Sequence, residues 1–109
     1  MTNPNKAKGS KFELDVVRYL QEHGFPFVQR AYGAGRQDDR GDILGVPGFT
    51  IECKDHAKHD IPGWLGEAER ERHNAGTRFG VVIVKRRGKG AAESYVVQTL
   101  ASWVEGLEG

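Results

Sequence analysis

The segment from Asp42 to Lys54 constrains the fold of this chain most, because it reads as a β-hairpin with two different faces. Side chains on a strand alternate between faces at ~3.3 Å per residue, so Thr50, Glu52 and Lys54 lie on one face. The opposite face takes the apolar residues Phe49, Ile51 and Cys53. The hairpin is therefore expected to be polar on one face and to supply core residues on the other.

The length of the hairpin turn decides whether Asp42 lies beside Glu52. A two-residue turn at Pro47 and Gly48 would place Asp42 on the face opposite Glu52, because a one-residue slip turns every side chain over. An odd-length loop over 46–48 with its last residue in the left-handed region, or a bulge at Gly45, pairs Asp42 directly with Glu52. We predict the odd loop, which brings the two carboxylates to one face.

The remaining sequence predicts further helices and strands around this hairpin. Ser10 and Glu13 form a capping-box pattern, which predicts a helix from Ser10 to about His23. Asp60 before Ile61 and Pro62 is typical of a second helix start, with Gly76 at its end. Its expected inward stripe is Trp64, Leu65, Ala68, Arg72 and Ala75.

Strands are expected at 27–31, within the hairpin over 42–55, at 79–84 and at 94–98, with a short helix from Thr99. A polar loop over 33–41 holds Arg36, Asp38, Asp39 and Arg40, and a basic turn covers 85–90. The order of helix, three strands, helix, two strands and helix predicts an α/β sandwich with a mixed sheet.

Length and composition indicate one domain over residues 1–109, with residues 1–8 as a flexible basic arm. The single cysteine cannot form an internal disulfide, and no apolar run has the length of a membrane span. We therefore expect a cytoplasmic protein without membrane contact. The formal net charge of +1 hides two basic clusters that could contact phosphates or simply solvate the surface. They are Lys6, Lys8 and Lys11, and Lys85, Arg86, Arg87 and Lys89.

The polar face of the hairpin has the residues that metal-assisted phosphodiester hydrolysis requires. Carboxylates such as Asp42 and Glu52 are the ligands that magnesium prefers, and a backbone carbonyl at Cys53 could complete the protein's share. Lys54 could reach the attacking water or the phosphate. The alternative is that Glu52 and Lys54 form an ordinary ion pair on a half-exposed strand.

Several other residues have simpler explanations. The capping box accounts for Glu13 without catalysis, although both roles are compatible if that helix packs over the polar face of the sheet. Cys53 is expected to be a small buried side chain, since no histidine is placed to activate it. His56 and His59 lack the partner pair of a structural zinc site, and we expect a solvated or phosphate-contacting face there. The glycines over 33–35 do not form a dinucleotide-binding loop.

Taken together, roughly residues 8–86 resemble the PD-(D/E)xK nuclease superfamily, and more closely the archaeal-type Holliday junction resolvases, which some phages also carry; in that case the expected location is the host cytoplasm. The matching segments, in consistent order, are Lys8-Gly9-Ser10 before Glu13, Gly24-Phe25, Arg30-Ala31, Asp42-Ile43, Glu52-Cys53-Lys54 and Phe79-Gly80-Val81-Val82. The resemblance implies a restriction-endonuclease-like sandwich with a mixed five-stranded sheet flanked by helices. It also implies a Mg²⁺-dependent endonuclease, with Mn²⁺ as a substitute.

In the site that the resemblance implies, Glu13, Asp42 and Glu52 organise the metal, Glu13 through water, and Lys54 assists the attacking water. Glu67, Arg70 or Glu71 could support the site from the second helix. The expected DNA contacts are Lys6, Lys8, Lys11, Arg30, Arg36, Arg40, Lys85, Arg86, Arg87 and Lys89. A four-way junction has approximate two-fold symmetry, so paired cuts imply a homodimer.

Two alternatives remain open from the sequence. One is a nicking, repair or restriction-like nuclease that acts on another form of DNA. The other is a DNA-binding module without catalysis, which would have no need of two carboxylates and a lysine on one face.

Overall fold

The computed structural model describes the backbone of residues 4–31 and 41–108 and the side chains of residues 9–31 and 41–108. The helices are α1 (Pro4–Glu22), α2 (Ile61–Ala75) and α3 (Leu100–Leu107), with a short 3₁₀ helix at Ala91–Glu93. The strands are β1 (Gln29–Arg30), β2 (Ile43–Leu44), β3 (Phe49–Lys54), β4 (Phe79–Val84) and β5 (Tyr95–Val97). This order confirms the predicted succession of helices and strands.

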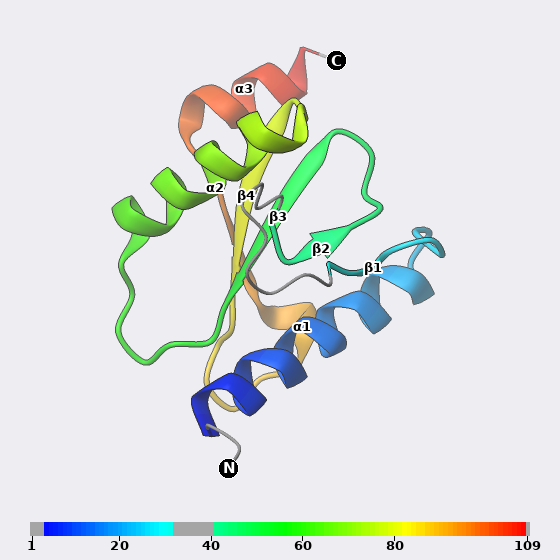
Figure 1. Cartoon of the computed structure of the whole chain (residues 1–109), viewed down its shortest axis with the longest axis vertical. Coiled ribbons are helices and arrows are strands. Elements are labelled where there is room, and N and C mark those ends of the chain that lie inside the picture. The colour runs from blue at the N-terminus through cyan, green and yellow to red at the C-terminus, as the bar shows by residue number, and fades with distance from the viewer. Residues whose placement is uncertain (1–3, 32–40, 109) are drawn as a thin grey trace.

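The strands form one five-stranded sheet in the order β1-β2-β3-β4-β5, shown in Figure 1. β3 and β4 are parallel, and every other neighbouring pair is antiparallel. The parallel pair requires a crossover, which α2 provides. The chain therefore has the α/β fold with a mixed five-stranded sheet that is expected of a restriction-endonuclease-like sandwich.

The sheet separates two apolar clusters. Residues of α1 pack with alternate residues of β3 and β4 on one face, in a cluster that includes Phe12, Val16, Val17, Ile51 and Val81. On the other face, Trp64 and Ala68 of α2 pack against Val82 and Val84. Figure 1 shows α1 and α2 on opposite sides of the two central strands. Because α2 covers the face that carries Glu52, α2 and not α1 completes the polar site.

The hairpin between β2 and β3 has the predicted odd loop. Ile43 pairs with Ile51, and the same register places Asp42 opposite Glu52. Gly48 ends the loop with φ +82°, in the left-handed region that favours glycine. The Asp42 N–H donates to the Ile51 carbonyl at 2.8 Å, which continues the ladder to the end of the strand.

α2 lies close to the sheet because β4 contributes a glycine at their contact. A Cβ atom on Gly80 would lie 2.9 Å from the carbonyl oxygen of Ala68, so a larger residue would push the helix away. The start of α2 is as predicted: Asp60 caps it and accepts a hydrogen bond from the Gly63 N–H at 3.1 Å. These local features set the distance between α2 and the polar face of β3.

The predicted start of the first helix at Ser10 is wrong. α1 begins at Pro4, so Ser10 and Glu13 lie inside the helix and do not cap it. Proline is favoured at the first helical position, and one glycine inside a helix costs only ~1 kcal/mol, so Gly9 does not interrupt α1. The flexible arm expected over residues 1–8 overlaps this helix from Pro4 onwards, and residues 1–3 lie outside the described residues.

The first strand is shorter than predicted. The Val28 N–H bonds to the Phe25 carbonyl in a turn, so pairing with β2 begins only at Gln29. The polar loop predicted over 33–41 lies outside the described residues except for Gly41.

Among the helices that the structure describes, none combines the length and apolar character needed to cross a membrane.

Candidate active site

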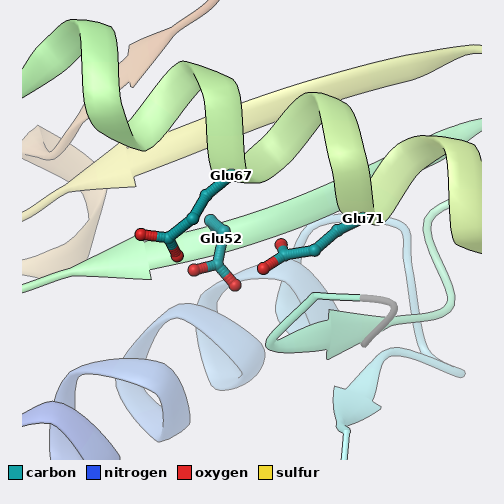
Figure 2. Close-up of side chains that lie close together, drawn as sticks. All are labelled: Glu52, Glu67 and Glu71. Carbon is teal, nitrogen blue, oxygen red and sulfur yellow. The ribbon is translucent and has the colours of Figure 1, made fainter. Parts of the chain in front are cut away.

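The candidate site centres on Glu52, which points from β3 toward α2. Glu52 and Glu71 are each only 4% exposed. Carboxylate oxygens of Glu52, Glu67 and Glu71 all lie within 4.8 Å of one another, and Figure 2 shows the three side chains converging from the strand and the helix. Acidic side chains are almost never fully buried without a partner, so this cluster requires compensation by protons or cations.

Asp42 joins the cluster from the end of β2. Its Oδ2 accepts a hydrogen bond from the Cys53 N–H at 2.8 Å, and its carboxyl group is hydrogen-bonded to that of Glu52. Burial raises the pKa of Asp42 to about 6; the Cys53 N–H opposes this shift and the charge of Glu13 adds to it. The structure thus brings the two predicted carboxylates into contact.

The same crowding acts more strongly on Glu52. Burial raises its pKa far above the usual range for a carboxyl group, and the charge of Asp42 and the hydrogen bond with Glu71 raise it further. Without a cation, a proton is therefore held among these carboxyl groups at neutral pH. A divalent cation could replace that proton, because its charge favours the ionised form of every ligand.

Lys54 lies at the edge of the carboxylate cluster. Its Nζ is 3.5 Å from Glu52 Oε2 and 3.1 Å from Glu67 Oε2. Burial alone would lower the pKa of Lys54, but the hydrogen bond to Glu67 and the nearby carboxylate charges outweigh burial and raise it. Lys54 is therefore a cation at neutral pH, held close to the group that would bind metal.

Glu13 is near the site, although α1 covers the other face of the sheet. Arg30 Nε donates to Glu13 Oε1 at 3.1 Å, and both side chains are partly buried. The charge of Glu13 contributes to the raised pKa of Asp42, which places Glu13 on the Asp42 side of the cluster. This position agrees with an indirect role better than with membership of the Glu52 group.

Cys53 is a core residue, as predicted. Its side chain packs against the cluster between α1 and the sheet, on the face away from Glu52. Burial and the surrounding carboxylates raise the pKa of its thiol, so the thiolate that nucleophilic catalysis would need is disfavoured.

The second helix supplies the residues that the sequence left undecided. Glu67 and Glu71 face the cluster, whereas Arg70 is exposed to solvent. Glu71 continues the buried stripe formed by Trp64 and Ala68, at helical intervals of four and three residues. The signal was therefore present in the sequence as a glutamate on an apolar stripe.

The predicted basic residues divide into three groups. Lys11 is exposed and paired with Asp15 at 2.9 Å, and Arg30 is bound to Glu13. Lys85, Arg86 and Arg87 line one pocket, and Lys89 is exposed in the same turn. The side chains of Lys6 and Lys8, together with residues Arg36 and Arg40, lie outside the described residues.

The pocket lined by Lys85, Arg86 and Arg87 has a volume of about 470 Å³ and lies beyond the end of β3. His56, His59 and Tyr95 form other parts of its wall. The two histidine rings also pack against Trp64, at 5.5 and 5.8 Å between centroids. The pocket therefore places the two histidines beside basic side chains, and phosphate contact at this face stays a prediction.

The donor set fits a hard divalent cation. Buried carboxylate oxygens concentrated at one point suit magnesium or manganese, and Lys54 adds a positive charge beside them.

A model of the archaeal Holliday junction resolvase (Hjc) family matches residues 4–65, a range that contains Glu13, Asp42, Glu52 and Lys54. No curated protein and no solved structure gave a significant match.

Proposed function

Because the chain belongs to the archaeal Holliday junction resolvase family, we propose that it is a magnesium-dependent endonuclease that cuts four-way DNA junctions by paired hydrolysis. The observation that carries this proposal is the contact of Asp42 and Glu52 beside Lys54 on one face of the sheet. A module that only binds DNA has no use for carboxylates buried at this energetic cost.

The metal ligands in this proposal are Asp42, Glu52 and the backbone carbonyl of Cys53. Glu71 lies in hydrogen-bonding contact with Glu52 and would fix the orientation of that ligand, while Glu13 acts through water. When bound, Mg²⁺ or Mn²⁺ would polarise the scissile phosphate and stabilise the charge that develops on it. Lys54 would hold the attacking water or a phosphate oxygen through its ammonium group.

The DNA would run from the carboxylate cluster across the basic pocket beyond β3. Lys85, Arg86 and Arg87 would neutralise backbone phosphates next to the cut, and Lys6, Lys8, Lys11, Arg36, Arg40 and Lys89 would extend the contact. Arg30, tied to Glu13, would lie closer to the metal ligands. Such contacts read the backbone and carry little sequence information, so binding should weaken steeply with salt.

A homodimer belongs to this proposal because each chain offers one carboxylate cluster and a junction needs two symmetric cuts. The test is to compare cleavage of a four-way junction with cleavage of linear duplex, flap and single-stranded DNA in Mg²⁺. We expect paired nicks in the junction and little cutting of the other forms. Equal or faster cutting of linear duplex would contradict junction resolution and favour a nicking or restriction-like nuclease.

A further inference from the structure

α3 is attached to the rest of the protein by its polar and small residues. Ser102 Oγ donates to Gln98 at 2.8 Å, and Arg78 donates to the Glu105 side chain at 3.2 Å and to its backbone carbonyl at 3.1 Å. Gly106 lies against the ring of Phe79. The side of the helix that faces the protein is therefore not its apolar side.

The apolar residues of α3 recur at positions i, i+3, i+4 and i+7, which places them along one stripe of the helix. We call this surface the α3 stripe; its exposed fractions are 74% for Leu100, 52% for Trp103, 40% for Val104 and 65% for Leu107. No residue of α3 is buried. A helix usually packs such a stripe against the core, whereas the α3 stripe is exposed to solvent.

We propose that the α3 stripe is where a second copy of this chain docks, so that two α3 helices meet across a two-fold axis. This inference rests on the proposed function, since paired cuts require two catalytic sites in fixed relation. It adds the surface through which the two copies of the chain bind each other.

The size of the stripe agrees with such an interface. Four large side chains exposed to this extent present about 500 Å² per chain, so two copies would bury up to about 1,000 Å² from the stripe alone, about the minimum for a specific interface. An apolar patch of this size is at the upper end for a monomer.

The absence of charge on the α3 stripe favours a second copy over other partners. A surface that meets its own copy across a two-fold axis must avoid facing like charges, and the stripe contains none. DNA would require cations. A helix that lies on a membrane surface usually has Lys or Arg on its polar face, whereas the charged residue of α3 is Glu105, and Glu108 follows at its C-terminal cap.

The position of α3 keeps the interface away from the DNA path. α3 contacts Arg78 and Phe79 at the start of β4, whereas Lys54 and the basic pocket lie at the opposite ends of the parallel strands. Six residues of strand separate the two ends by about 16 Å. Figure 1 likewise shows α3 at the end of the molecule away from the N-terminus. Docking through α3 would leave both catalytic faces open.

The test compares the mass in solution, by light scattering, of wild type, Trp103→Glu and Leu107→Glu, each also checked for folding by circular dichroism. We expect a dimer for wild type and a monomer for both variants. Phe27→Glu is the matched control, because Phe27 is 87% exposed on a different surface. The Phe27→Glu protein should therefore remain a dimer. A monomeric wild type, or dimers in both α3 variants, would overturn the inference.

A crosslinking experiment tests the same contact without destabilising it. Val104→Cys should form a covalent dimer on mild oxidation, whereas Phe27→Cys should not; the partly buried Cys53 thiol, with its raised pKa, should not compete. Failure of Val104→Cys to crosslink in a dimeric protein would also overturn the inference. A dimer that ignores the α3 changes yet resolves junctions leaves the proposed function intact. If the α3 variants are monomeric but the wild-type dimer prefers to cut linear duplex, only the proposed function is contradicted.

Discussion

The ammonium group of Lys54 donates to both carboxylate oxygens of Glu67, at 3.1 and 3.3 Å. Lys54 comes from β3 and Glu67 from α2, so this contact ties the strand to the helix that covers it. Glu52 is the second partner of the same ammonium group, at 3.5 Å. Glu67 thus limits how far Lys54 can move toward Asp42 and Glu52, and in the proposed function it is a positioning residue.

Glu67→Gln should slow junction cleavage by about 10-fold to 100-fold, the usual effect of removing a group that orients a catalytic side chain. We expect a lower kcat with an unchanged dissociation constant for the junction, measured in single-turnover assays and by fluorescence anisotropy. Glu69→Gln is the control, because Glu69 lies on the same helix but pairs with Arg72. Equal losses in both variants would indicate a general effect on α2.

Asp42→Asn, Glu52→Gln and Lys54→Ala should each reduce Mg²⁺-dependent cleavage by about 10²-fold to 10³-fold or more, because each removes a charge placed at the reacting phosphate. Junction binding measured in Ca²⁺ should change little, since the basic residues that contact the backbone remain. Unchanged cleavage in all three variants would exclude this cluster as the catalytic site.

The raised pKa values of Asp42 and Glu52 predict that stability without metal falls as pH rises. The folded chain keeps protons that the unfolded chain has lost above about pH 4, so this contribution is full at low pH and disappears as pH rises through about 6 for Asp42 and higher for Glu52. Mg²⁺ or Mn²⁺ would replace those protons. The rise in melting temperature on adding metal should therefore be larger near pH 8 than near pH 5.

Glu71→Gln is the variant that isolates this charge crowding. An amide beside Glu52 removes one buried carboxylate, so the metal-free protein should melt at a higher temperature than wild type near pH 8 and differ less near pH 5. Thermal melts in EDTA at both pH values measure the difference. A metal-free Glu71→Gln protein that is less stable than wild type at high pH would contradict the assignment.

Gly41 precedes Asp42 and holds it in place through backbone conformation. Its φ is +94°, and a Cβ atom there would lie 2.9 Å from the Ile51 carbonyl oxygen. We expect Gly41→Ala to cost about 3 kcal/mol of folding free energy and to reduce cleavage. Gly24→Ala, at φ +102° but with open space around it, should cost about 1 kcal/mol, measured by urea unfolding. Equal costs would show that the contact with Ile51 is unimportant.

The sequence predicted the hairpin well because the alternation of side chains and the length of the turn are local. The register that pairs Asp42 with Glu52, the buried strand at Phe79–Val84 and the capped start of α2 all follow from neighbours in the chain. The start of α1 did not, since a capping-box pattern at Ser10 also occurs inside a helix.

The contribution of α2 to the site could not be derived in the same way. Which face of the sheet α2 covers is a tertiary property, and the capping-box interpretation of Glu13 directed attention to α1 instead. The close approach of α2 at Gly80 and the buried position of Glu71 became visible only when strand and helix were placed together.

The most direct test of this account is anomalous diffraction from a crystal of the protein soaked in Mn²⁺. We expect one strong peak at bonding distance from the carboxylates of Asp42 and Glu52, with Lys54 beside it. A peak at another place, or no peak while these carboxyl groups remain hydrogen-bonded to each other, would contradict the assignment of this cluster as a metal-dependent nuclease site.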